Sequence, residues 1–253
     1  MCNMKTISVM NVKGGVGKTV SAVNLAEILA AEYGKSVLVI DADPQGDATY
    51  MLAPDNDPDQ TGLYGLLALG ALLQEAVVET RYRGIDLVPG STDLVYLEME
   101  ASARITASLG GILERSGYDV VLIDCPPSFG PATVAALSCA DLVLIPVAMD
   151  ALSIRGGQLL LTELEAVHEI APTKAQARIL PTMYHRCEAC DQALRYLDTQ
   201  NLPHTRTAIR RTDKVPESTF YAQLLGEYSP RSSAGRDYRM LTEELAELLW
   251  KEA

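Results

Sequence analysis

The sequence predicts an α/β fold with a doubly wound, mostly parallel sheet that carries helices on both faces. Short runs of consecutive apolar residues, long enough for buried strands, alternate with longer segments of helical periodicity. A glycine-rich turn follows the first of these strands, and two later strands end in aspartate. Apolar residues make up 48% and charged residues 21% of the 253 residues, which suits a globular chain with a sizeable core.

The expected strands are Thr6–Val12, Ser36–Ile40, Ile85–Val88, Val120–Ile123, Leu142–Val147 and Ile179–Tyr184. Val120–Ile123 and Leu142–Val147 are near-continuous apolar runs, as a parallel sheet covered by helices requires. The expected helices are Lys18 to about Tyr33, turns around Leu63–Leu73, Ala103–Ser116, Ala132–Ser138, Leu152–Ile170, Cys190–Thr199 and Ala234–Lys251. Gly34 ends the first helix, because a residue without a Cβ adopts the left-handed conformation at little cost. No repeat or linker interrupts this order, so we expect a single domain over residues 1–253.

The composition excludes several classes of protein. The formal net charge of −12 excludes a uniformly cationic surface for nucleic acid or membrane, although it leaves room for a local basic patch. No apolar run approaches the roughly 20 residues of a membrane span. The first residues, Met1–Lys5, lead directly into a strand and do not resemble a signal peptide. Five scattered cysteines indicate a reducing compartment, so we expect a cytoplasmic protein.

A phosphate-binding loop is predicted between the first strand and the first helix. The segment Val12–Thr19 has the glycine spacing that lets backbone N–H groups surround the β- and γ-phosphates at a helix N-terminus. Lys18 would neutralise phosphate oxygens, and the Thr19 hydroxyl would complete a Mg²⁺ shell. The residues expected to bind the nucleotide here are Lys13, Gly14, Gly15, Val16, Gly17, Lys18, Thr19 and Val20.

The form Lys-Gly-Gly-x-Gly-Lys-Thr, with Val12 at the usual first glycine, is the deviant Walker A signature. It resembles the ParA/MinD superfamily of dimerising P-loop ATPases. The resemblance implies that Lys13 reaches across a dimer interface to the partner's nucleotide. A cation supplied in trans stabilises charge on the transferring phosphoryl group, as an arginine finger does.

Two further strands end in carboxylates that fit the same chemistry. Asp41–Thr49 reads Asp-Ala-Asp-Pro-Gln-Gly-Asp-Ala-Thr and resembles the A′ motif of ParA and Soj. That resemblance implies that Asp43 orients the attacking water and contributes to the Mg²⁺ site, and that Asp41 supports Mg²⁺ and the loop lysine. Asp124 ends an apolar strand in the Walker B pattern and would hold Mg²⁺ through water or accept from Thr19. The sequence therefore predicts ATP and Mg²⁺ as cofactors.

The resemblance is less sharp in the second half of the chain. The segment Ala148–Gly157 takes the place of a dimer-facing segment that usually carries a glutamate, and Asp150 is the nearest carboxylate. The strand ending near Met183 precedes the family's adenine pocket, so Met183 and Pro216 are expected near the base. The usual Arg-Thr-Asn is replaced here by Cys187-Glu188-Ala189.

The pair Cys187 and Cys190 suggests an alternative function. Mrp/ApbC iron–sulfur carrier ATPases have a CxxC at a comparable place, where a symmetric dimer supplies four ligands. This chain lacks their proline inside the motif and has Asp-Pro-Gln in its A′ region. A reduced surface pair without function is the other interpretation, and His185 is expected to be a solvated side chain.

Basic residues concentrate between Pro203 and Met240, with seven Lys and Arg against four acids. ParA proteins bind DNA without sequence preference, so Arg210, Arg211 and Lys214 are the expected phosphate contacts, against the alternative of a solvated face. The last helix is acidic, unlike a membrane-targeting helix, and no membrane partner is expected. The resemblance implies a ParA/Soj-type partition ATPase: a homodimer on ATP binding, nucleoid-associated, stimulated by a ParB-type protein. A regulator that binds a protein partner through the Leu152–Ile170 helix stays open as a third interpretation.

Overall fold

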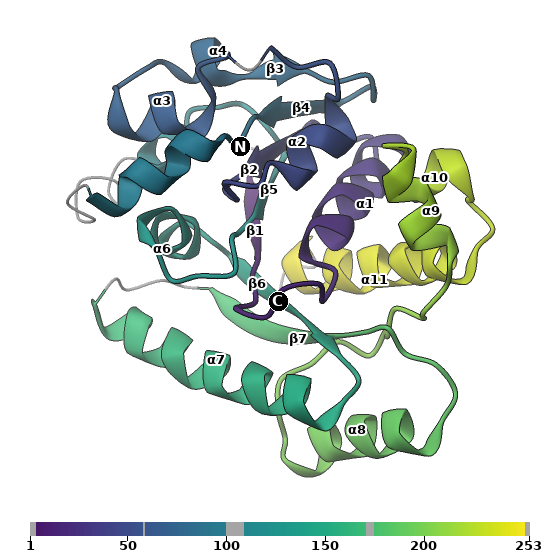
Figure 1. The fold of residues 1–253 in the computed structure, drawn as a ribbon. Helices are drawn as coiled ribbons and strands as arrows, with labels where there is room; N and C mark the ends of the chain where they lie inside the picture. Colours follow the sequence, from purple (N-terminus) through teal and green to yellow (C-terminus); the bar gives the residue numbers. More distant parts are fainter. Residues whose placement is uncertain (1–3, 58, 100–108, 171–174, 251–253) are drawn as a thin grey trace.

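The chain folds around a central sheet of seven strands in the order β3-β4-β2-β5-β1-β6-β7 (Figure 1). A computed structural model describes residues 4–57, 59–99, 109–170 and 175–250. The strands are β1 (Lys5–Val9), β2 (Val37–Asp41), β3 (Val78–Glu79), β4 (Ile85–Val88), β5 (Val120–Asp124), β6 (Leu142–Ala148) and β7 (Gln176–Thr182). All neighbouring strands are parallel except β3, which runs antiparallel to β4 at the edge. The expected doubly wound fold is confirmed.

Helices cover both faces of this sheet. The described helices are α1 (Lys18–Ala31), α2 (Asp47–Leu52), α3 (Gly62–Ala68), α4 (Leu73–Ala76), η1 (Thr92–Met99), α6 (Pro131–Ser138), α7 (Ala151–Ile170), α8 (Glu188–Thr199), α9 (Lys214–Phe220), α10 (Leu225–Tyr228) and α11 (Ser233–Trp250). One face packs against α1, α2 and α11, and the other against α3, α6, α7 and α8. Among the described helices, none has the length and apolar character that crossing a membrane requires.

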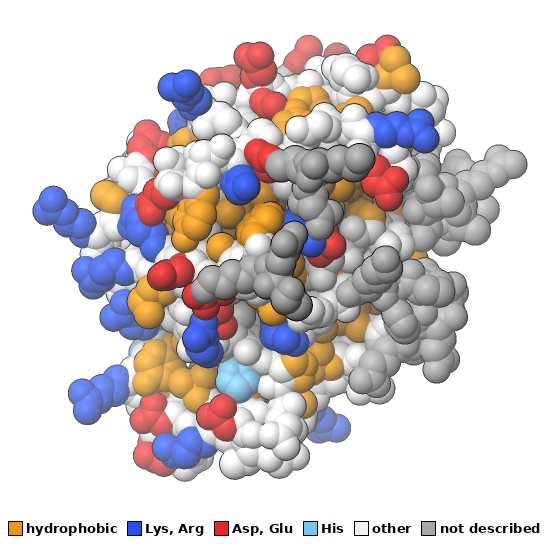
Figure 2. Space-filling model, turned by 180° about the vertical axis from the view of Figure 1, so that it is seen from behind, with side chains coloured by type: hydrophobic (Ala, Val, Ile, Leu, Met, Phe, Trp, Pro, Cys, Tyr) orange, Lys and Arg blue, Asp and Glu red, His pale blue; other side chains and the backbone are white. Residues whose placement is uncertain are grey.

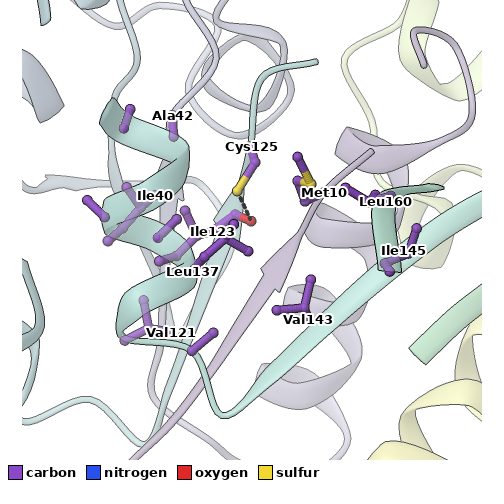
Figure 3. Close-up of a cluster of buried hydrophobic side chains, with 14 of the residues drawn as sticks. Met10, Ile40, Ala42, Val121, Ile123, Cys125, Leu137, Val143, Ile145 and Leu160 are labelled. Atoms are coloured by element: carbon purple, nitrogen blue, oxygen red, sulfur yellow. Dashed lines mark hydrogen bonds between the residues drawn. The ribbon is translucent and has the colours of Figure 1, made fainter. Parts of the chain in front are cut away.

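Alternation along each strand divides the core into two layers. In β2, Leu38 and Ile40 face α6, whereas Val37 and Val39 face α1. Figure 3 shows the first layer, where Ile40, Val121 and Ile123 lie close to Leu137 of α6. Because the strands are buried on both faces, a near-continuous apolar run is needed in each of them. The predicted runs therefore correspond closely to the observed strands.

Most expected elements are confirmed, with small shifts at their ends. The turns expected around Leu63–Leu73 form two helices, α3 and α4. They are separated by Gly70, whose φ of +72° is incompatible with a continuous helix. The strand expected over Ile179–Tyr184 begins earlier and ends at Thr182. The first part of the helix expected over Ala103–Ser116 lies outside the described residues, and residues 109–113 are helical. Lys251, the expected end of the last helix, also lies outside them.

The topology brings the sequence motifs to one edge of the sheet. β1 lies between β5 and β6, and β2 lies on the far side of β5. Parallel strands end at the same edge, so the phosphate loop after β1 is adjacent to Asp124 of β5, which is paired in register with Asp41 of β2. In open α/β sheets, ligands bind beyond these carboxyl ends where the strand order reverses.

Candidate nucleotide-binding site

The phosphate loop connects β1 to α1 through backbone conformations that require glycine. Gly15 and Gly17 have φ values of +71° and +95°, in the left-handed region that strains any residue with a Cβ. Gly17 immediately precedes the first helical residue, Lys18. The backbone N–H groups that such a turn directs inward form an anion-binding concavity at the positive end of α1.

Two buried polar side chains attach this loop to the sheet. Asn11 donates to the carbonyl of Pro146 in β6 at 2.7 Å and accepts from the backbone N–H of Lys13 at 2.9 Å. The Thr182 hydroxyl at the end of β7 donates to the carbonyl of Val16 at 2.9 Å. These contacts fix the loop before any ligand arrives, which lowers the entropy cost of binding. Sequence analysis did not identify either residue, because each contact joins segments far apart in the chain.

A cleft of about 840 Å³ opens over the loop, a volume suited to a nucleotide. The residues expected to bind nucleotide that line this cleft are Gly14, Gly15, Val16, Gly17, Lys18, Thr19, Val20, Met183 and Pro216. Asp43 lines it too, from the loop after β2. The fold thus brings four separate segments of the sequence to one cavity, namely the phosphate loop and the segments that carry Asp43, Met183 and Pro216.

Lys13 and Lys18 lie in the same loop but face different surroundings. Lys18 is 8% exposed, and its Nζ lies 3.4 Å from the carbonyl of Lys13. The Nζ of Lys13 instead donates to Ser153 Oγ at 2.5 Å and lies 3.6 Å from a carboxylate oxygen of Asp150. Lys13 is not among the described residues that line the cleft of its own protomer. Its expected role in trans stays a prediction.

Asp150 immediately precedes α7 and forms an ion pair with Lys13. Its carboxylate accepts from both the backbone N–H and the hydroxyl of Ser153, at 2.8 and 2.5 Å, as a helix N-cap does. Partial burial raises the pKa of the Asp150 carboxyl, but the Ser153 hydrogen bonds and the Lys13 charge outweigh that effect and lower it. Asp150 is therefore charged at neutral pH, and Lys13, Ser153 and Asp150 form a continuous hydrogen-bonded chain.

Two carboxylates lie buried beneath the cleft. Asp41 accepts from the N–H and hydroxyl of Thr49, both at 2.7 Å, and from the N–H of Asp43. Burial still raises the pKa of Asp41 to about 6. Burial, with the charge of Asp41 next to it, raises the pKa of Asp124 well above its ordinary value. Asp41 was expected to support the loop lysine, but the hydrogen bonds that the structure gives it go to Thr49 and Asp43.

Asp124 has the features of a carboxylate that requires a cation. Both of its oxygens are buried without a hydrogen-bond partner among the described residues. Such a group costs free energy unless something pairs with it. The Thr19 hydroxyl and the Lys18 ammonium are near enough to favour its charged form. A hydroxyl and a carboxylate are oxygen donors of the kind that Mg²⁺ prefers, so the residues present fit that ion.

Asp43 occupies a more open position than the two buried carboxylates. It is half-buried, it lines the cleft, and its Oδ1 accepts from the backbone N–H of Gln45 at 3.0 Å. Gly90, after β4, approaches this loop so closely that a Cβ there would lie 2.8 Å from the carbonyl oxygens of Asp41 and Asp43. The N–H of Gly90 also donates to Thr49 Oγ1 at 3.0 Å. Thr49 and Gly90 therefore position Asp43, and sequence analysis assigned no such role to either of them.

The three basic residues expected to bind DNA have different environments. Arg210 forms a bidentate pair with Asp237, with a closest distance of 2.5 Å, and Asp237 is almost fully buried. Lys214 pairs with Glu217 at 2.6 Å. Arg211 is exposed and makes no ion pair with any described residue. Arg210 and Arg211 also line the nucleotide cleft. Their role in DNA binding stays a prediction, and only Arg211 offers a guanidinium without a carboxylate partner.

The expectation of a surface cysteine pair is wrong for Cys190. That residue is 1% exposed and its Sγ lies 3.6 Å from the carbonyl of Met149, whereas Cys187 is partly exposed at the start of α8. A cluster shared across a dimer requires both sulfurs to face the partner. The burial of Cys190 therefore does not favour the iron–sulfur carrier interpretation. His185 is exposed, as expected of a solvated side chain, and its Nδ1 also lies 3.7 Å from Cys190 Sγ.

The sheet order, the glycine-rich loop and the buried carboxylate at the end of β5 define a P-loop NTPase with a deviant Walker A loop. A family model described as AAA domain matches residues 4–177. The chromosome-partitioning ATPase Soj of Thermus thermophilus is 36% identical, with the match covering 96% of this chain and 95% of the relative. The sporulation initiation inhibitor protein Soj of Bacillus subtilis is 31% identical over 96% of this chain and 98% of its own length. The chain belongs to the ParA/Soj family of ATPases.

Solved structures share the same fold. Cyanothece McdA without ligand superposes with a TM-score of 0.85 at 22% identity, covering 96% of this chain and 100% of that one. The Mycobacterium smegmatis cobyrinic acid a,c-diamide synthase, solved with an ATP analogue and magnesium, gives 0.81 at 28% identity, covering 97% and 95%. The same architecture therefore holds a nucleotide and magnesium in a related protein.

Proposed function

We propose that this protein is a partition ATPase and that residues 1–253 form a single domain. It binds Mg·ATP, dimerises in the ATP-bound state, holds double-stranded DNA without sequence preference, and is stimulated by a ParB-type partner in the nucleoid-containing cytoplasm. The observation that carries the proposal is that the phosphate loop and Asp43 line one cleft, while the unpartnered Asp124 lies buried next to Thr19 and Lys18 of that loop. The name of the Thermus relative, a chromosome-partitioning ATPase, supports the cellular role.

The chemistry of the cleft suits hydrolysis of the γ-phosphate by an in-line water. Asp43, at the rim, orients that water, and Lys18 neutralises charge that develops on the phosphoryl oxygens. Thr19 and Asp124 would hold Mg²⁺, which when bound supplies positive charge to the β- and γ-phosphates. Met183 and Pro216 border the cleft where the base would lie.

In this proposal, Lys13 acts on the nucleotide of a second protomer. To act in trans it must leave Ser153 and Asp150, and its exposed fraction of 47% allows that movement. A half-exposed ion pair contributes about 1 kcal/mol or less, so the exchange costs little compared with contacts to a nucleotide phosphate. The monomer therefore keeps this lysine away from its own cleft and available for dimer formation.

The charge distribution supports binding of DNA to one side of the molecule. Residues 203–240 carry seven Lys and Arg and four acids, within a chain of net charge −12. In Figure 2, Lys and Arg side chains gather along the left edge, which corresponds to the right-hand side of Figure 1, where α9 and α10 lie. Dimerisation doubles such a patch, so that two weak phosphate-binding surfaces act together only in the ATP state.

The test is DNA binding by Asp43→Ala, which should trap the ATP-bound dimer. We expect affinity for random-sequence duplex DNA with ATP but not with ADP or without nucleotide, and a steep loss as salt rises. Arg211→Ala in this background should lower the affinity and reduce the salt slope by about 1. The matched control is Arg115→Ala. Arg115 is exposed and lies shortly before the amino end of β5, whereas the phosphate loop lies at the carboxyl ends of the strands. Dimerisation with ATP but no DNA binding would remove DNA from the mechanism.

A further inference from the structure

Three metal-ligating side chains meet outside the nucleotide cleft, between the end of β7 and the start of α8. They are His185, Cys187 and Cys190, and their ligand atoms all lie within 4.8 Å of one another. From this geometry we infer that the cluster is a binding site for a single soft divalent cation of the Zn²⁺ type. The site is separate from the Mg²⁺ site beneath the phosphate loop and is formed within one protomer.

The spacing of the three ligands is close to what a tetrahedral ion requires. Zn²⁺ binds thiolate at about 2.3 Å and imidazole nitrogen at about 2.0 Å, so two ligands of a tetrahedral site lie about 3.5–3.8 Å apart. The Nδ1 of His185 and the Sγ of Cys190 are already 3.7 Å apart. The largest separation in the cluster, below 4.8 Å, exceeds the ideal by only about 1 Å, which a side-chain rotation can supply.

The backbone holds the two sulfurs in place before an ion binds. Cys187 is the N-cap of α8, and its Sγ accepts from the N–H of Cys190 at 3.4 Å. Cys190 lies one turn into the helix, where it is buried against the carbonyl of Met149. His185 is exposed. An ion held by these three residues would have its inner side enclosed and its fourth position open to water or a further ligand.

Ligand chemistry separates the two metal sites. Thiolate and imidazole are soft or borderline donors that select Zn²⁺ over Mg²⁺, whereas the donors near the phosphate loop are oxygens. Millimolar Mg²⁺ therefore does not compete for the cysteines. The site also differs from a cluster shared between protomers, because all three ligands come from one chain and one sulfur is buried.

The test uses the full chain, reduced with a phosphine and freed of metal, in the presence of Mg²⁺. Zn²⁺ is titrated against a chromophoric chelator, and Co²⁺ reports the ligand set by its thiolate charge-transfer and visible d–d absorption. We expect one ion per chain with tetrahedral Co²⁺ spectra. Cys187→Ser and His185→Ala should each weaken Zn²⁺ affinity by more than about 100-fold, beyond the effect of losing an outer hydrogen-bond partner.

Cys187→Ser should fold normally, since serine is a favourable N-cap. Retained ATP binding by both variants checks that the fold is intact. Cys139→Ser is the matched control, a cysteine at the end of α6 that bonds backbone carbonyls only, and it should bind Zn²⁺ as the parent does. Three results would overturn the inference: no stoichiometric Zn²⁺ binding by the reduced protein, octahedral Co²⁺ spectra, or equal loss of affinity in the Cys139 control. A Cys187–Cys190 disulfide that forms while Zn²⁺ is ignored would also overturn it.

Discussion

Asp41 and Asp124 occupy paired register positions at the carboxyl ends of β2 and β5, and both are fully buried. Only Asp41 is surrounded by hydrogen-bond donors, since Thr49 and the N–H of Asp43 bond to it. Asp124 has no such partner among the described residues. Two adjacent buried carboxylates with unequal hydrogen bonding are electrostatically costly without a cation, which supports the proposed Mg²⁺ site.

This arrangement predicts a pH dependence of stability. Burial raises the pKa of Asp41 to about 6, and burial with the charge of Asp41 raises that of Asp124. The pKa of an aspartate in the unfolded chain is about 3.9. The stability that these two groups contribute is therefore fully present below that pH, and it is lost as the pH rises through their pKa values in the folded protein. Asp124→Asn should therefore stabilise the Mg²⁺-free protein relative to the parent, and by more at about pH 8 than at about pH 5.

Urea unfolding at both pH values measures this difference. Saturating Mg²⁺ and ADP provide the control, because the charged carboxylate is then needed and the variant should become the less stable protein. A variant that is equally destabilised at both pH values, with and without ligand, would contradict a cation-binding role for Asp124.

The two loop lysines should differ in what they support. Lys13→Gln should leave the affinity of the monomer for ADP within about twofold, because Lys13 contacts Ser153 and Asp150 instead of its own cleft. Lys18→Gln should lower that affinity by about tenfold or more, since a charge-assisted contact is lost. Fluorescent ADP titration measures both. Light scattering with ATP should then show no dimer for Lys13→Gln, whereas an equal loss of ADP affinity in both variants would place Lys13 in the cis site.

Gly90 should be intolerant of a single methyl group. A Cβ there would lie 2.8 Å from the backbone oxygens of Asp41 and Asp43, which cannot move aside as a flexible side chain does. We expect Gly90→Ala to cost about 1–3 kcal/mol of stability and to reduce ATP turnover more than ADP binding, because Asp43 is displaced. Gly111→Ala is the control, since nothing lies within 4 Å of its Cβ. Unchanged melting and turnover in Gly90→Ala would refute the close contact.

Arg210 and Arg211 are adjacent in sequence but should respond differently to truncation. Arg210→Ala leaves the buried carboxylate of Asp237 with only a backbone donor and should lower the free energy of unfolding by about 1–3 kcal/mol. Arg211→Ala should change stability by less than about 0.5 kcal/mol. Thermal melts separate the two effects. A DNA-binding defect in Arg211→Ala without a change in melting temperature would then report a phosphate contact, whereas a comparable loss of stability in both variants would show that Arg211 has a structural partner.

Sequence alone predicted the strands well and the side-chain partners poorly. Strands buried on both faces need near-continuous apolar runs, so Val120–Ile123 was located almost to the residue, and Ile85–Val88 was located as well although it contains Asp86. The two-residue β3 has no such pattern because it is a short antiparallel edge. The helix α2 begins inside the A′ motif, where no helix was expected.

The candidate site was predictable wherever a motif is contiguous. The phosphate loop, Asp43 and Asp124 follow from local spacing, and the structure brings them to one region. The contacts of Lys13 with Ser153 and of Arg210 with Asp237 join segments far apart in the chain, so no local pattern encodes them. The approach of His185 to Cys190 has no local signal either, because it depends on how β7 leads into α8.

Thr182 connects two parts of the site that otherwise belong to different elements. Its hydroxyl bonds to the carbonyl of Val16 in the phosphate loop, and its own carbonyl accepts from the N–H of Met149, the residue before Asp150. A displacement of the phosphate loop would therefore reach the segment that carries Asp150, the partner of Lys13, through a single residue. Thr182, at the end of β7, thus couples nucleotide contact in the loop to the position of the residue that holds Lys13.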